Sequence, residues 1–240
     1  MEPTGIIFAA LDCDLDVIEA WNRWYDLEHT PPNLSLDGVV MSNRYVATPA
    51  LHAARQSAAD GPFSAQHASF LTVYTLTGDP QTAFDGMSGL RDVLVADGRM
   101  EFPEDKKIVR QGDVLETVAA RAAVATKCPP VDVPFMGHTG IIVRQCRGEN
   151  ANESEKVLQS STLPGVNAVW ALASRLQENV TMQIFFVEGD LRERQQQIGN
   201  HLQGSTATIV LFGAFERITQ LHYPWADAMR NSSLPPTILD

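Results

Sequence analysis

The chain has 240 residues, 44% of them hydrophobic, and its 18 basic and 29 acidic side chains give a net charge of −11. This apolar content suffices for a sizeable core and excludes a globally disordered protein. The acidic balance excludes a non-specific binder of nucleic acid or of anionic membranes, because both partners need a basic face. Three distant cysteines with no C-x-x-C pair indicate neither a disulfide framework nor a zinc site.

The apolar run near the start, Gly5–Leu11, is too short to span a bilayer. It also lacks the charged flank of a signal peptide. We therefore expect a cytoplasmic protein without a membrane partner.

A proline-rich segment divides the chain. Residues 123–137 contain three prolines, which neither a helix nor a central strand accommodates. We interpret 123–137 as a linker between a first unit, 1–122, and a second unit, 138–219, with a C-terminal tail at 220–240. The first unit has 9 basic and 18 acidic residues, a net charge of −9, whereas residues 123–240 have 9 and 11, a net charge of −2.

The first unit is predicted to follow the order strand, helix, strand, strand, helix, strand. Its first helix can be capped by Asp14 or Asp16 and is expected to stop at Pro31–Pro32. The predicted segments are a strand at Gly5–Leu11, a helix to about His29, a strand at Val39–Ala47, a polar loop to about Gln66, a strand at Ala68–Leu76, a helix at Gln81–Ala96 and a strand around Val114–Ala120.

The second unit repeats this order, beginning with Thr139–Val143 (TGIIV), which repeats Thr4–Phe8 (TGIIF) 135 residues later. This order is that of the split-βαβ, ferredoxin-like unit, an antiparallel sheet with helices on one face. The strands are apolar on both faces, so both faces must be covered. We predict an α+β fold in which two tandem ferredoxin-like βαββαβ units pack sheet to sheet as a barrel within one chain. The later segments are a helix near Glu153–Ser160, strands at Val166–Leu172 and Val180–Val187, a helix at Leu191–Leu202 and a strand at Ala207–Phe215.

The densest group of functional side chains lies in the first predicted helix. Trp21, Trp24, Tyr25 and Glu28 share one helix face, and Tyr25 and His29 are one turn apart. A core role is the simplest interpretation of the two tryptophans. His29 is either a cap at the helix end or an acid–base residue, and the helix dipole and the acidic half are expected to raise its pKa.

Further candidates lie on the following strands and in the second unit. Strand alternation places Arg44 and Tyr45 on opposite faces, so at most one of them points into a given cavity. For each single candidate, a satisfied core or edge position is the competing interpretation. The remaining candidates are His67, Phe70 and Tyr74 in the first unit and Trp170, Arg175 and His138 in the second.

The sequence lacks the motifs that mark several kinds of chemistry. The nucleotide-binding glycine signatures and the G-x-S-x-G hydrolase signature are missing. No H-x-x-x-H or H-E-x-x-H pair predicts a metal site. We therefore expect a reaction that needs no metal and no nucleotide.

The segment Trp21–Tyr45, WNRWYDLEHTPPNLSLDGVVMSNRY, resembles the helix-to-strand segment of EthD-like proteins in the dimeric α+β-barrel superfamily. Asp37 stands where that pattern usually has proline, and the second unit matches only by its order of elements. The resemblance implies a cavity between the sheet and its helices. It also implies His29 as the acid or base, aided by Tyr25 and Tyr45. Members of the superfamily include cofactor-independent cyclases, dehydratases, isomerases and monooxygenases, and haem-handling enzymes.

Three functions follow from these observations. The leading one is a cofactor-independent lyase or isomerase, of dehydratase or cyclase type, acting on a small apolar ring or polyketide-like carbonyl compound. His29 would move the proton, and Tyr45, Tyr74 or Arg44 would stabilise the enolate. The alternatives are a monooxygenase, cofactor-free or haem-binding, and a non-catalytic small-molecule binder. The two tandem units form a pseudo-dimer within one chain, and this pseudo-dimer can pair again as a homodimer. The aromatic walls are expected from Trp21, Trp24, Phe70 and Trp170, with His67 near the substrate.

Overall fold

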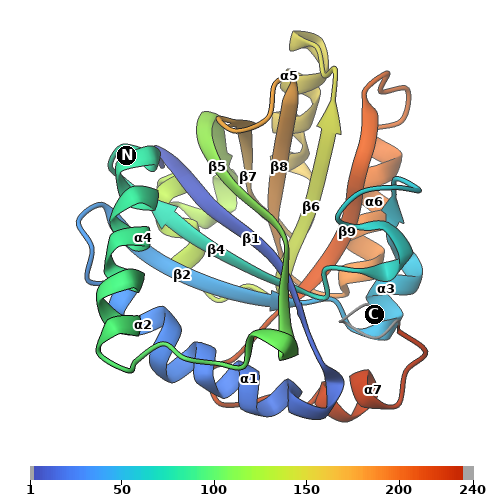
Figure 1. Ribbon diagram of the computed structural model, residues 1–240. Coiled ribbons are helices and arrows are strands. Elements are labelled where there is room, and N and C mark those ends of the chain that lie inside the picture. The colour runs from blue at the N-terminus through green and yellow to red at the C-terminus, as the bar shows by residue number, and fades with distance from the viewer. Residues whose placement is uncertain (1–2, 235–240) are drawn as a thin grey trace.

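The computed structural model describes residues 3–234, and within them eight antiparallel strands close into a barrel (Figure 1). The order around the barrel is β2-β4-β1-β5-β7-β8-β6-β9, and β9 pairs back onto β2. A ninth, two-residue strand, β3, pairs with the outer edge of β9. The strands are β1 Gly5–Cys13, β2 Val39–Val46, β3 Gln56–Ser57, β4 Phe70–Leu76, β5 Lys107–Ala122, β6 Gly140–Arg147, β7 Val166–Ser174, β8 Val180–Val187 and β9 Thr208–Arg217.

The barrel consists of two four-stranded halves with the same internal order. β1, β2, β4 and β5 form one half, in the order β2-β4-β1-β5, and β6 to β9 form the other, in the order β7-β8-β6-β9. In each half the first strand lies between the third and the last, as in a ferredoxin-like unit. This topology confirms the predicted α+β class with its two tandem βαββαβ units.

The two seams between the halves differ in length. β5 and β7 pair from Leu115–Ser174 to Ala122–Ala168. β2 and β9 pair only at Tyr45–Arg217 and Val46–Glu216. The barrel is therefore closed by a long seam between β5 and β7 and by a short seam of two residue pairs between β2 and β9.

Helices lie outside the barrel (Figure 1). α4 and the segment from α1 to α2 cover the first half, and α7 lies beside α1. The α-helices are α1 Ile18–Trp24, α2 Thr30–Asn33, α3 Pro49–Ala54, α4 Pro80–Ala96, α5 Ala151–Gln159, α6 Leu191–His201 and α7 Ala226–Arg230. No helix in the described part of the chain is long and apolar enough to cross a membrane.

Strand alternation separates two apolar layers. Along β1, Ile6 and Phe8 belong to the core inside the barrel, whereas Ile7 and Leu11 pack beneath the helices. This arrangement explains why the strands are apolar on both faces, since each half is covered by its helices outside and by the opposite half inside.

The expected stop at Pro31–Pro32 is wrong. α1 continues through a π-helical turn, Tyr25–His29, directly into α2, which ends at Asn33. The two prolines occupy the first turn of α2, where a missing N–H costs little. In the wide turn, the N–H of Thr30 donates to the carbonyl of Tyr25, five residues earlier.

Other predicted boundaries shift as well. The expected polar loop before Gln66 contains α3 and β3, and the strand expected around Val114–Ala120 extends over all of β5. The proline-rich segment forms short 3-10 turns at Val124–Thr126 and Pro130–Phe135. In the C-terminal tail, α7 packs against the first half, and residues 235–240 lie outside the described part.

Candidate active site

A cavity of about 320 Å³ lies between the sheet of the first half and its helices. We call it the His29 cavity. β1 and β4 form its floor, and the π-helical turn and α4 form its walls. Its lining residues include Ile7, Ala9, Leu11, Trp24, Tyr25, His29, Asn33, Thr72, Tyr74, Phe84, Met87, Arg91, Met100, Glu104 and Lys107.

Aromatic contacts hold the His29 imidazole. Its ring centroid is 4.4 Å from that of Tyr25 and 4.9 Å from that of Trp24. Within the described residues, neither ring nitrogen of His29 has a hydrogen-bond partner, although the side chain is only partly exposed. The imidazole is thus fixed by its faces and leaves both nitrogens for a ligand.

His29 is neutral near pH 7. Burial and the positive charges of Arg44, Lys107 and Arg91 lower its pKa from 6.5 to about 3. The expectation that acidic surroundings would raise this pKa is therefore wrong. The reason is spatial, because the imidazole is buried and the charges that act on it are those of three cations, even though the first unit carries a net charge of −9.

Two buried tyrosines stand beside His29. Burial raises the pKa of both Tyr25 and Tyr74, which keeps their hydroxyls protonated. Asn33 Nδ2 donates to the Tyr74 hydroxyl oxygen over 3.1 Å. The Tyr74 proton therefore remains available to an acceptor.

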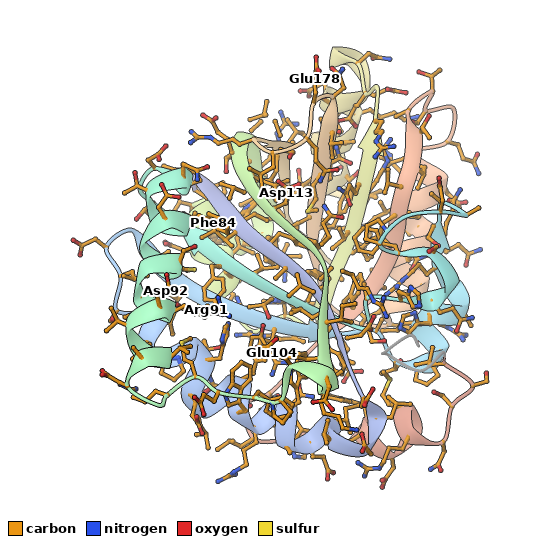
Figure 2. The ribbon with its side chains drawn as sticks, in the orientation of Figure 1. Phe84, Arg91, Asp92, Glu104, Asp113 and Glu178 are labelled. Atoms are coloured by element: carbon orange, nitrogen blue, oxygen red, sulfur yellow. The ribbon has the colours of Figure 1, made fainter. Side chains whose placement is uncertain are left out.

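Charged side chains of both signs lie at the mouth of the cavity. Lys107 Nζ lies 5.1 Å from the centroid of the Trp24 ring and 3.1 Å from Glu104 Oε1. Figure 2 shows Phe84 and Arg91 on the side of α4 that faces the sheet, and Glu104 at the lower end of the same space. A wider hollow of about 620 Å³, lined partly by the same residues, leads to the surface.

Arg44 is buried behind Tyr25. Its guanidinium carbon is 4.2 Å from the centroid of Tyr25 and 5.0 Å from that of Trp21. Arg44 Nη1 is 3.5 Å from Asp26 Oδ1, a loose ion pair. Arg44 does not line the His29 cavity, so it influences His29 through its charge and through Tyr25.

Tyr45 and Trp170 do not lie in this cavity. Both face the barrel interior and are fully buried there. The Tyr45 hydroxyl pairs with His138 Nε2 over 3.0 Å, and the Trp170 ring packs edge-on against Phe186. Alternation from Arg44 places Tyr45 on the opposite face of β2, so the two expected roles beside His29 do not hold.

The remaining candidates have structural surroundings. Trp21 packs against Phe70, which also contacts Trp225 under the helical layer. His67 lies in the loop before β4, where its carbonyl accepts from Arg55 Nη1 over 2.6 Å. Arg175 pairs with the carboxylates of Asp79 and Glu116.

Several residues of the cavity were not predicted from the sequence. Lys107 begins β5, Arg91 lies in α4, and Asn33 lies beyond the prolines that were expected to end the helix. No local motif marks Lys107 or Arg91. Asn33 could have been found from its position four residues after His29. Its side-chain Nδ2 donates to the backbone carbonyl of His29 over 3.1 Å. Within the described residues, no group of three His, Cys, Asp or Glu side chains could hold a metal ion.

No family model and no curated protein matches this chain. Solved structures do match in fold. A candidate chlorite dismutase is similar with a TM-score of 0.55 and 7% identity over 95% of this chain and 98% of its own. A candidate monooxygenase from Lactobacillus acidophilus gives 0.49 and 10% over 91% and 95%, and one from Fusobacterium nucleatum gives 0.45 and 9% over 92% and 97%.

The chlorite dismutase-like structure shares the overall fold of the present chain, an antiparallel α+β barrel. At identities of 10% or less, the likeness extends to the fold alone. The chemistry has to be argued from the residues of the His29 cavity.

Proposed function

We propose that this α+β barrel is a cofactor-independent lyase or isomerase that acts on a small, enolisable carbonyl compound, and that it is EthD-like in its first half. The observation that carries the proposal is a neutral imidazole, without a hydrogen-bond partner among the described residues, in an apolar cavity with two protonated tyrosines. Both the dehydratase type and the cyclase type would begin with the removal of a substrate proton by this imidazole.

The first step is removal of a proton from the carbon next to the carbonyl. A ring nitrogen of His29 accepts the proton, and the C–H electron pair moves onto the carbonyl oxygen to form an enolate. Tyr25 and Tyr74, which line the cavity, would donate hydrogen bonds to that oxygen. The charges of Arg44, Lys107 and Arg91, which disfavour the imidazolium, favour the enolate beside it.

The low pKa of His29 restricts the substrate. A base with a pKa of about 3 is weak, so it removes only an acidic proton efficiently. The carbon between two carbonyls, as in a polyketide-like compound, carries such a proton. The volume of 320 Å³ lies near the lower end of small-molecule pockets, about 300–1,000 Å³, which favours a compact ring.

The cofactor-free monooxygenase of the same superfamily is the second candidate. The same neutral imidazole would deprotonate an electron-rich phenol, and the cationic surroundings would stabilise the phenolate. Haem fits the residues poorly, because the His29 cavity is small and the Trp24 and Tyr25 rings pack against the imidazole. We therefore derive no step through haem.

Solvent-deuterium exchange tests the proposal directly. The protein is incubated in D2O with 1,3-dicarbonyl ring compounds, and label incorporation is followed by mass spectrometry. We expect catalysed exchange that His29→Gln lowers about 10²–10⁴-fold and that His201→Gln, in α6, leaves unchanged.

Other outcomes would replace the proposal. Oxygen consumption with phenols that depends on His29 would assign the oxygenase instead, and a Soret band in the purified protein would assign haem. Saturable binding of these compounds with no exchange and no oxygen uptake would indicate a non-catalytic binding protein.

A further inference from the structure

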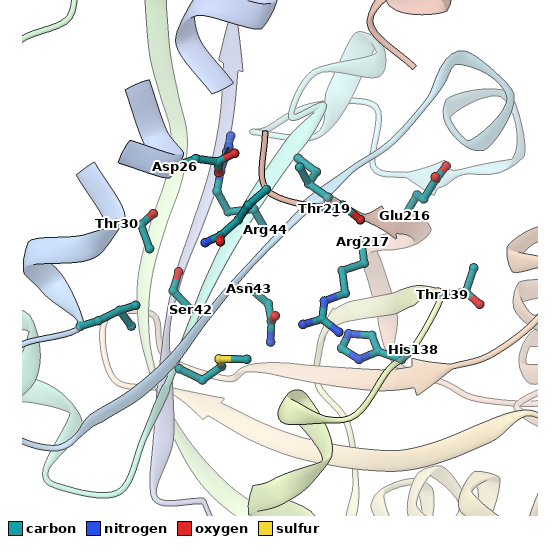
Figure 3. Close-up of a pocket in the computed structure, with 14 residues that line it drawn as sticks. Asp26, Thr30, Ser42, Asn43, Arg44, His138, Thr139, Glu216, Arg217 and Thr219 are labelled. Carbon is teal, nitrogen blue, oxygen red and sulfur yellow. Dashed lines mark hydrogen bonds and ion pairs between the residues drawn. The ribbon is translucent and has the colours of Figure 1, made fainter. Parts of the chain in front are cut away.

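A second cavity, of about 900 Å³, lies where β2 and β9 diverge beyond their two paired residues (Figure 3). We call it the seam pocket. Both halves contribute to it, and it shares no lining residue with the His29 cavity. Its polar lining includes Thr30, Ser42, Asn43, Arg44, His138 and Arg217.

Arg44 lines this pocket, and its buried guanidinium has unpaired donors. Its side chain is 5% exposed, and within the described residues its Nε and Nη2 have no hydrogen-bond partner. Nη1 has only long contacts, 3.4 Å to the Asn22 carbonyl and 3.5 Å to Asp26 Oδ1. Leaving charged donors buried and unpaired is costly, so this guanidinium is incomplete without an acceptor.

The free donors have a geometry that selects the acceptor. Nε and Nη2 lie on one edge of the planar guanidinium, and a carboxylate presents two coplanar oxygens at the matching spacing. The hydroxyl-bearing side chains of Thr30 and Ser42 line the same pocket, as do the apolar side chains of Leu34, Met41 and Ile218. The pocket thus offers an ionic end and an apolar wall.

The charges around the pocket favour an anion near Arg44. Asp26 is already occupied, since its Oδ2 accepts from the Leu221 N–H and the Tyr223 hydroxyl and its Oδ1 faces Arg44. The side chain of Glu216 points away from Arg44 in Figure 3. Arg217 lies beside His138 and donates through Nη1 to the Met136 carbonyl over 3.0 Å, and it forms no ion pair within residues 3–234.

We propose that the seam pocket binds a small organic carboxylate, whose two oxygens accept from Arg44 Nε and Nη2 while its apolar body lies against the pocket wall. Arg217 adds a second positive charge at the other side of the pocket. The proposal stands on residues outside the His29 cavity, so it holds whether or not His29 is catalytic.

Benzoate is the probe, titrated into the full chain and followed by calorimetry. We expect saturable binding that Arg44→Lys weakens at least about tenfold, because lysine keeps the charge but loses the two-donor edge. Arg217→Gln should weaken it about threefold through the lost charge. Arg91→Gln is the matched control at the mouth of the His29 cavity and should leave the affinity for benzoate unchanged.

Four results would overturn the proposal. They are no saturable binding, binding that neither Arg44→Lys nor Arg217→Gln weakens, binding that Arg91→Gln weakens as much, and tighter binding of inorganic phosphate than of benzoate. Circular dichroism checks each variant. If Arg44→Lys fails to fold, Arg217→Gln and Ser42→Ala decide by the same criteria.

Discussion

The Tyr25 ring packs against both His29 and Arg44. Its centroid lies 4.4 Å from that of the imidazole and 4.2 Å from the guanidinium carbon. One aromatic ring therefore contacts a neutral base and a permanent, buried cation. After burial, the charge of that cation is the largest cause of the lowered pKa of His29. In the proposed reaction, the same charge would favour an anion formed in the cavity.

The Tyr25 hydroxyl is expected to serve the reaction, whereas that of Tyr45 is not. Tyr25→Phe keeps the ring that contacts His29 and Arg44 but removes one donor for the enolate, so the exchange rate should fall about 10²-fold. Tyr45→Phe removes only the hydrogen bond to His138 in the barrel. It should leave the exchange rate unchanged and lower the free energy of unfolding by about 1 kcal/mol. Equal losses of rate in both variants would contradict this assignment.

Buried His52 should make the fold acid-sensitive. Burial, with the nearby charges of Arg55 and His67, lowers its pKa from 6.5 to about 2, and its Nε2 pairs with Ser69 Oγ over 3.1 Å. The unfolded chain therefore binds the proton more tightly. The resulting stability is complete above pH 6.5 and is lost progressively as the pH falls toward 2.

Urea unfolding at two pH values measures this loss. Between pH 7.5 and pH 5, His52 should contribute a decrease of about 2 kcal/mol in the free energy of unfolding. His52→Gln should remove that share of the pH dependence. The exposed His222→Gln variant is the control and should retain it; identical slopes in the two variants would show that His52 is not responsible.

Asp26 is expected to anchor the C-terminal segment. Its Oδ2 accepts from the Tyr223 hydroxyl over 2.6 Å and from the Leu221 N–H over 2.8 Å. Tyr223→Phe should lower the free energy of unfolding by about 1–2 kcal/mol and speed proteolysis within residues 218–234. Asp26→Ala should cost about 3–5 kcal/mol, because it also leaves Arg44 without its counter-ion. Asp227→Ala, which breaks an exposed pair with Arg230, should change the free energy by less than about 1 kcal/mol.

Gly5 and Gly140 are expected to tolerate no side chain. A Cβ at Gly5 would overlap the Leu115 carbonyl oxygen, and one at Gly140 would overlap that of Phe215. Gly5→Ala and Gly140→Ala should each lower the free energy of unfolding by about 2 kcal/mol or more, measured by urea titration. Gly89→Ala, at an exposed and open position of α4, should instead raise it by about 0.5–1 kcal/mol. Neutral substitutions at both strand positions would contradict this explanation.

These two glycines show why the repeat was visible in the sequence. Each is the first residue of the first strand in its half, at a point where the backbone of the paired last strand lies very close. The same steric demand therefore selects the same residue 135 positions apart. Similarly, strands that are apolar on both faces indicate that both faces are covered. This pattern predicted the barrel.

The helix end was mispredicted because of a local rule. A pair of prolines commonly ends a helix, but here a π-helical turn precedes Pro31 and Pro32 and both lie in the first turn of α2. Such a turn depends on packing against the sheet beneath it. The propensities of the individual residues do not show it.

By itself, the sequence determined the order of elements, the duplication, the α+β class and the helix that carries Trp24, Tyr25 and His29. These follow from periodicity and steric demands that act within one or two neighbouring elements. Only the tertiary structure decided that Lys107 and Arg91 lie near His29, that Tyr45 faces the barrel, and that Arg44 is buried with unpaired donors beside the seam pocket.

The net charge of the first unit illustrates how a property of the sequence differs from a property of the folded chain. A net charge of −9 on the first unit is a sum over its whole surface. The pKa of His29 instead depends on burial and on three cations, contributed by β2, α4 and β5. The interaction between two charges depends on the distance between them and on their burial, so only the folded chain determines the sign of the charge that a buried group experiences.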